Sequence, residues 1–206
     1  MESWNKKLTT AAWKGDIEAL KLSLQNGADI DYQDVRYGWT ALMSAAEGGH
    51  LEICRLLIDR RCKIDITSRD NGWTALMFAA RRGHLEICRL LIDTGCKIDT
   101  TLSDSGWTAL MWAVKTERLE VCRLLIDRGC KIDITHNSGY TALHYAAEEG
   151  YLQITRCLVE QGGASPLVTT HEGKTPYDLA AAKQYKEVME YLQVHIVLNY
   201  KCLHLE

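Results

Sequence analysis

Cysteine and histidine are the residue types in this chain that could carry nucleophilic or metal-binding chemistry. The 206-residue sequence holds eight cysteines and seven histidines. A cysteine nucleophile needs a base within hydrogen-bond reach, and a structural zinc ion needs four ligands around one centre. Six of the cysteines instead form two evenly spaced series: Cys54, Cys88 and Cys122, and then Cys62, Cys96 and Cys130.

This periodicity argues against shared disulfides and metal sites. Equivalent positions of stacked helices lie about 8–10 Å apart, whereas a disulfide needs Cα atoms within about 7 Å and zinc holds sulfur at about 2.3 Å. We expect the thiols to be small, buried, apolar groups in a reducing compartment. A disulfide inside one repeat, such as Cys54 with Cys62, stays open.

The histidines do not form a shared site with the cysteines. His50 and His84 occupy one repeated position, and His144 aligns with methionines in other repeats. The sequence contains no glycine-rich phosphate loop and no His-Glu-x-x-His zinc motif. We therefore expect no catalytic residues, no metal and no cofactor. An enzyme that depends on cysteine or a metal is the remote alternative.

A repeated phrase predicts the elements that must position every side chain. Gly38-Trp39-Thr40-Ala41-Leu42 recurs, with substitutions, in phrases that begin at Gly72, Gly106, Gly139 and Gly173. A second phrase, Leu51 to Asp59, recurs at residues 85–93 and 119–127 and, degraded, at 152–160. A fixed period of roughly 33–34 residues is typical of a linear stack of similar units.

The repeat at residues 38–71 illustrates the expected local structure. Thr40 is a good N-cap for a first helix, Gly48-Gly49 ends it, and a second helix begins near Leu51. Residues 61–71 are polar and predict a loop or hairpin. Two short helices cannot bury a core alone, so each repeat must cover its neighbour.

The motifs Gly-x-Thr-Ala-Leu-x-x-Ala-Ala, Gly-His-Leu-Glu-Ile and Gly-Cys-Lys-Ile-Asp resemble the ankyrin repeat. The resemblance implies an all-α solenoid of six helix-turn-helix units with projecting β-hairpin-like turns, and a protein-binding function for the helix face and turn tips. It implies an ankyrin-repeat domain at residues 1–193, followed by a tail at 194–206. The expected repeats span residues 5–37, 38–71, 72–105, 106–138, 139–172 and 173–193.

Charge and hydropathy exclude several other classes of function. The net charge is −3, so the basic excess typical of nucleic-acid binding is absent. Apolar runs are too short for a membrane span, and the first seven residues lack the apolar core of a signal peptide. We expect a monomer that binds neither nucleic acid nor membrane, in the cytoplasm or, alternatively, the nucleus.

Three segments depart from the repeat. Glu117 stands where other repeats have glycine, and it costs about 1–2 kcal/mol if the backbone there is left-handed. Residues 162–167 disturb the fifth turn. The apolar tail after Val194 leaves the pattern without indicating its conformation.

Aromatic and basic residues on the expected concave face are the candidate partner-binding site. Tryptophan and tyrosine dominate interface hot spots, although rings here could instead hold the stack together. Arg81, Arg82 and Lys115 would form a basic centre flanked by glutamates, suited to an acidic partner segment. The full candidate set is Trp13, Trp39, Trp73, Phe78, Arg81, Arg82, Trp107, Trp112, Lys115, Tyr140 and Tyr145.

The expected function is recognition of another protein, as an adaptor, scaffold or inhibitor. The alternative is a purely structural solenoid that acts as a spacer in a larger assembly.

Overall fold

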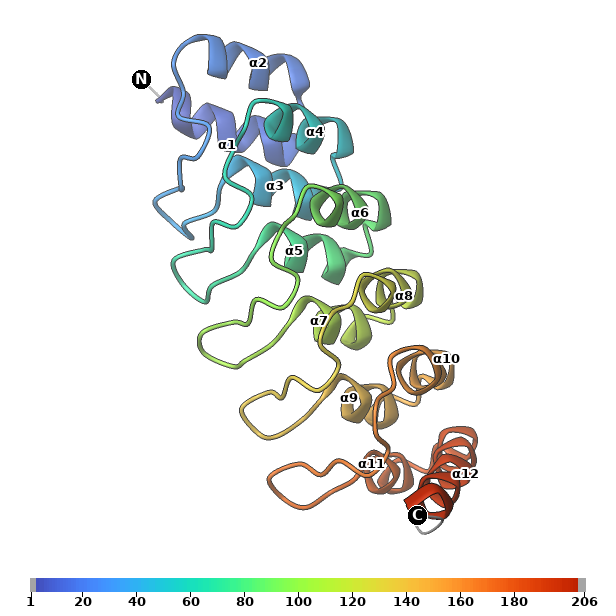
Figure 1. The fold of residues 1–206 in the computed structure, drawn as a ribbon. Coiled ribbons are helices and arrows are strands. Elements are labelled where there is room, and N and C mark those ends of the chain that lie inside the picture. Colours follow the sequence, from blue (N-terminus) through green and yellow to red (C-terminus); the bar gives the residue numbers. More distant parts are fainter. Residues whose placement is uncertain (1–2, 204–206) are drawn as a thin grey trace. The chain divides into compact units, whose positions relative to one another are not determined.

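The computed structural model describes residues 3–203, and within this range helices are the sole regular secondary structure, without strands. The chain divides into two compact halves, residues 1–104 and 105–206. In each half, short helices form hairpins, and a long loop leads from each hairpin to the next (Figure 1). The predicted all-α ankyrin-type solenoid is confirmed.

The N-terminal half contains three helix hairpins. Their helices are α1 (Trp4–Lys14), α2 (Ile17–Gln25), α3 (Ala41–Gly48), α4 (Leu51–Asp59), α5 (Ala75–Arg82) and α6 (Leu85–Asp93). The first helices α1, α3 and α5 pack on one another in that order.

The C-terminal half continues the same pattern. Its helices are α7 (Ala109–Lys115), α8 (Leu119–Asp127), α9 (Ala142–Glu148), α10 (Leu152–Arg156), the π-helical turn Cys157–Gln161, α11 (Pro176–Ala182) and α12 (Lys186–Leu203). Here α7 packs on α9, and α9 packs on α11.

The repeated threonine fixes where the first helix of each repeat after α1 begins, and Ser3 takes this place before α1. The Thr40 hydroxyl accepts a hydrogen bond from the Met43 backbone N–H at 3.2 Å, and Thr74 and Thr108 cap α5 and α7 in the same way. Each bond satisfies one of the helix's unpaired N–H groups. In the last repeat, Thr175 caps α11 and Pro176 occupies the first turn.

A left-handed residue separates the two helices of each hairpin. Gly15, Gly49, Gly83 and Gly150 have φ between 76° and 82°. Glu117 holds the same position with φ of 58°, so the condition under which this residue costs strain is met.

Small side chains on the first helices and aliphatic side chains on the second helices form the core. Ala45 and Ala46 of α3 are completely buried, as are Cys54 and Leu57 of α4. The alanines allow close approach of neighbouring helices, so the apolar surface of one repeat is covered by the next.

The loops are closed by hairpin-like hydrogen bonds, although they form no strands within the described residues. Ser68 N–H donates to the Trp73 carbonyl at 2.9 Å, and His136 N–H donates to that of Tyr140 at 2.7 Å. An aspartate ladder also links successive repeats, because Asp31 accepts from the backbone N–H of Lys63 at 2.8 Å. The equivalent Asp65 accepts from that of Lys97 at 2.9 Å.

The fifth repeat carries its irregularity in a helix as well as in the turn. The step from Leu152 to Ala164 is longer by a single residue than the equivalent step from Leu119 to Cys130 in the preceding repeat. The structure accommodates this extra residue as the π-helical turn Cys157–Gln161, a common consequence of an insertion in a helix. The prediction that the irregularity lies only at residues 162–167 is therefore incomplete.

The expected tail at 194–206 begins as a helix, because α12 continues without a break through Leu203. Val194 and Val197 are exposed on it. Residues 204–206 lie outside the described range. Within that range, none of the helices has the length and apolar character that a bilayer crossing requires.

Candidate functional site

Four rings form a continuous aromatic row on the first helices and loops of the N-terminal half. The ring centroids of Trp13 and Trp39 are 6.0 Å apart, and those of Trp39 and Phe78 are 4.5 Å apart. Trp73 stacks on Phe78 with 4.7 Å between the ring centroids. We call Trp13, Trp39, Phe78 and Trp73 the aromatic row.

The members of the aromatic row differ in what they offer to a partner. Phe78 is only 2% exposed because Trp39 and Trp73 cover it. Its ring therefore orders the row instead of contacting a partner directly, which corrects the sequence-based emphasis on Phe78. Trp13 is 48% exposed, and Trp39 and Trp73 are partly exposed.

The exposed end of the row borders an open hollow of about 420 Å³. We call it the N-terminal hollow; it is lined by Thr9, Thr10, Trp13, Asp34, Arg36, Tyr37, Trp39 and Ser44. The Asp34 carboxylate accepts hydrogen bonds from the backbone N–H groups of Arg36, Tyr37 and Trp39 at 2.7 to 2.9 Å. These bonds hold the loop that carries Tyr37, whose side chain is 41% exposed.

Sequence reasoning missed Tyr37 and Arg36. Both lie in a loop whose sequence differs between successive repeats, so the repeat pattern does not mark these positions. The signal that could have found them is Asp34, an acceptor positioned to close a turn of the following residues.

A buried carboxylate organises the predicted basic centre. Glu47 is 4% exposed, and its Oε1 atom accepts from Arg81 Nη2 at 2.7 Å and from Arg82 Nε at 2.8 Å. We call these three residues the Arg–Glu triad. Glu47 does not flank the arginines, as the sequence suggested, but lies beneath them and compensates part of their charge.

A second aromatic cluster lies in the C-terminal half. Trp107 contacts Trp112 at 4.5 Å and Tyr145 at 4.6 Å between centroids, and Tyr140 lies 5.2 Å from Tyr145. Tyr145 is thus enclosed as Phe78 is, with 7% exposure, and burial raises the pKa of its hydroxyl. Lys115 forms an ion pair with Glu149 and lies 5.6 Å from the Tyr145 ring.

Three histidines, His50, His84 and His144, contact backbone carbonyls of neighbouring repeats. His50 Nε2 lies 3.0 Å from the Trp13 carbonyl, and His84 Nε2 lies 3.3 Å from that of Glu47. His144 is fully buried. Its Nδ1 accepts from the Thr141 N–H at 3.1 Å, so its Nε2 donates to the Lys174 carbonyl at 3.2 Å.

The thiols lie in surroundings that oppose nucleophilic chemistry. The cysteines whose side chains the structure describes are free, and all but Cys96 are buried. Burial raises the pKa of Cys54, Cys62, Cys88 and Cys96 to about 12. Thiolate is the reactive form, so these groups are unreactive near neutral pH. No group of three or more metal-binding side chains occurs among the described residues.

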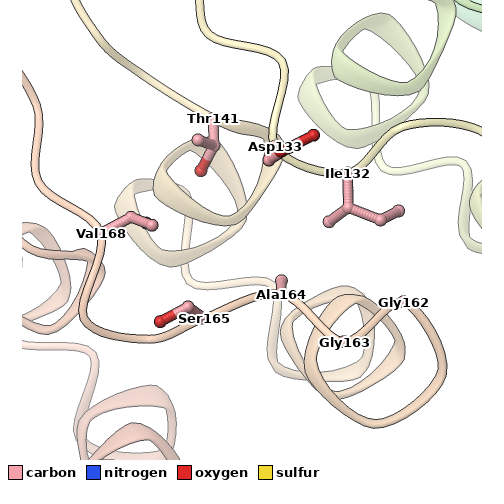
Figure 2. Close-up of a pocket in the computed structure, with 8 residues that line it drawn as sticks. All are labelled: Ile132, Asp133, Thr141, Gly162, Gly163, Ala164, Ser165 and Val168. Carbon is pink, nitrogen blue, oxygen red and sulfur yellow. The ribbon is translucent and has the colours of Figure 1, made fainter.

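A further hollow of about 350 Å³ lies beside the irregular fifth repeat. Figure 2 shows its lining, which comes from the loop before α9, the start of α9 and the segment after the π-helical turn: Ile132, Asp133, Thr141, Gly162, Gly163, Ala164, Ser165 and Val168. The small residues Gly162, Gly163 and Ala164 leave this space open. Its lining contains one charged side chain, Asp133, and no aromatic ring.

The sequence matches a family model described as ankyrin repeats (3 copies). The matched segments are residues 8–101, 61–136 and 128–201, which overlap and together cover most of the chain. No curated protein matches the sequence. Ankyrin repeats are generally protein–protein interaction modules and are typically non-enzymatic. The repeated threonine caps, the stacked hairpins and the matched segments together show that this chain belongs to the ankyrin repeat family.

Proposed function

We propose that this chain recognises another protein through the exposed end of the aromatic row and the N-terminal hollow. The observation that carries the proposal is the exposure of Trp13 and Tyr37 at a hollow of about 420 Å³. Large aromatic side chains around a concavity are typical of interface hot spots. The Asp34 hydrogen bonds hold the loop in place before binding, which lowers the entropy cost of association.

The cluster around Trp107 is a second candidate contact region, and it belongs to the other half of the chain. Trp107 and Tyr140 are partly exposed there, whereas Tyr145 lies beneath them. The two regions differ in their balance of charge, since Lys115 beside the Trp107 cluster is paired with one carboxylate, that of Glu149, whereas Arg81 and Arg82 share the single carboxylate of Glu47. We also propose the repeat boundaries that the sequence predicts. A role as a scaffold, adaptor or inhibitor is part of the same proposal.

The test compares affinity capture from an extract of the source cells by three forms of the full chain. They are the wild type, the double variant Trp13→Ala/Tyr37→Ala and the control Leu22→Ala. Leu22 is 51% exposed on the second helix α2, so its loss removes a similar apolar surface from a different place. Captured proteins are identified and quantified by mass spectrometry.

We expect at least one protein to be retained by the wild type and by Leu22→Ala but lost by the double variant. Circular dichroism should show all three forms folded, because the substituted side chains are exposed. An identical set of captured proteins for the three forms would contradict the proposed site and favour the structural alternative.

A further inference from the structure

The Arg–Glu triad presents its positive side outward. The side chain of Glu47 is 2% exposed, whereas those of Arg81 and Arg82 are 32% and 52% exposed. Two cationic groups thus surround one buried anion, so the accessible part of the triad carries a net positive charge.

Arg82 is held in a geometry that leaves hydrogen-bond donors for a ligand. Its Nε lies 2.8 Å and its Nη2 lies 2.7 Å from Glu47 Oε1. A guanidinium has five N–H groups, and no hydrogen bond recorded in residues 3–203 uses the Nη1 atom of Arg82. Because Glu47 already orders the side chain, a further acceptor binds at a smaller entropy cost. A carboxylate is the acceptor among protein side chains whose planar geometry matches this group.

The triad adjoins the apolar part of the site. The Arg81 guanidinium lies 5.2 Å from the Trp73 ring centroid. Ser44, which lines the N-terminal hollow, precedes Glu47 by three residues on α3, so the two lie about one helical turn apart on the same side. A short segment could therefore reach both the hollow and Arg82.

The charges in the loops of the N-terminal half are mixed in sign, so the positive balance rests on the Arg–Glu triad itself. Arg36 and Arg69 are exposed in successive loops, and Asp70 is the exposed carboxylate beside them. The carboxylate of Asp34 is already engaged by its own loop. At the equivalent registers of the C-terminal half, Lys115 is ion-paired with Glu149, so that half offers no comparable excess.

We infer that the N-terminal half binds a polypeptide segment in which an Asp or Glu carboxylate docks on Arg82 while a nearby aromatic or large aliphatic side chain enters the N-terminal hollow. This inference rests on the proposed function and specifies the chemistry of the partner. Charge complementarity selects an acidic segment over a basic one, and the exposed rings of Trp13 and Tyr37 select an apolar anchor.

The test is a selection of short random peptides, displayed on phage, against the immobilised full chain. We expect the enriched peptides to share an acidic residue within a few positions of an aromatic or large aliphatic residue. Calorimetry then measures one enriched peptide and its Glu→Gln or Asp→Asn counterpart. With the wild type, the amide should bind more weakly by on the order of tenfold.

The same pair of peptides is measured with Arg82→Gln, with Arg82→Lys and with the control Arg55→Gln, which removes an exposed arginine from α4. With Arg82→Gln the acid and the amide should bind almost equally, because the charged acceptor has lost its donor. Arg82→Lys should give an intermediate difference, since it keeps charge without the planar geometry. Arg55→Gln should behave as the wild type does.

Two results separate failure of this inference from failure of the proposed function. Enriched peptides without a carboxylate, or an acid-to-amide difference that persists in Arg82→Gln, overturn the inference while segment binding stands. A selection that enriches no peptide contradicts segment recognition and the inference with it. If Arg82→Gln fails to fold, equal binding of the acid and the amide to the wild type still overturns the inference, and Arg82→Lys still tests whether the carboxylate docks on Arg82.

Discussion

Glu117 stores backbone strain that a single substitution should release. Its φ of 58° lies in the left-handed region, where the equivalent residues Gly15, Gly49, Gly83 and Gly150 have φ of 76° to 82°. A non-glycine residue in this region costs about 1–2 kcal/mol. Glycine also lowers the free energy of unfolding by about 0.4–1 kcal/mol, because it has greater conformational freedom in the unfolded chain. We therefore expect Glu117→Gly to raise the free energy of unfolding by about 0.5–1 kcal/mol.

The measurement is thermal unfolding followed by circular dichroism, with Glu117→Gln as the matched control. For a chain of this length, 1 kcal/mol corresponds to about 2–4 °C in Tm, so Glu117→Gly should melt about 1–4 °C higher than the wild type. The control removes the negative charge near the end of α7, where it is unfavourable to the helix dipole, but it leaves the backbone strained. If Glu117→Gly is no more stable than Glu117→Gln, the strain argument is wrong.

Three further predictions concern packing, protonation and thiol reactivity. Gly49→Ala should lower the free energy of unfolding by about 2 kcal/mol or more, and by more than Gly27→Ala does. Both glycines have positive φ, but only the Cβ added at Gly49 would lie 2.6 Å from a histidine ring atom of the next repeat. Equal losses of stability in chemical denaturation would contradict this prediction. Burial lowers the pKa of His144, so the unfolded chain binds more protons than the folded chain below about pH 6.5, and stability should fall as the pH drops from 7 to 5. His144→Met should reduce this loss of stability, measured as the urea midpoint at each pH. An unchanged loss in the variant would assign the pH dependence to other groups. Iodoacetamide at pH 7.5 should leave Cys54 and Cys88 unmodified in the folded protein and label them in urea, as read by peptide mass spectrometry; rapid labelling of the folded protein would contradict their burial.

Much of the helical framework could be predicted from the sequence, because the signals that define it are local and repeated. A threonine before every first helix after α1 provides an N-cap, and in four of the six repeats a glycine after the helix permits the left-handed turn. The fixed period then places equivalent residues side by side. Even the exception at Glu117 could be recognised from its alignment with glycines, although Gln184, with φ of 63°, is a second exception that sequence reasoning missed.

The exposure of the candidate site residues could not be predicted in the same way. Register places Phe78 and Tyr145 on the first helices, but their burial depends on rings from two successive repeats. Trp39 and Trp73 enclose Phe78, and Trp107 and Tyr140 enclose Tyr145. Such burial depends on the orientation of large side chains in the stack.

The Arg–Glu triad shows the same limitation for charge. The sequence indicates that Glu47 and Arg81 occupy equivalent positions in successive repeats. It does not indicate that the carboxylate is buried while the guanidinium groups stay partly exposed. The π-helical turn differs, because the lengthened step from Leu152 to Ala164 was already present in the sequence and could have predicted it.

The most direct test of partner binding at the aromatic row uses the indole N–H resonances of the tryptophans in a ¹⁵N-labelled chain. A captured partner, or a peptide from the selection, is titrated while two-dimensional NMR spectra are recorded. We predict that the resonances of Trp13, Trp39 and Trp73 shift, whereas that of Trp4, which lies in the first turn of α1 beside Lys7, stays unchanged. Saturable binding that shifts Trp4 and leaves the other three unchanged would contradict the account.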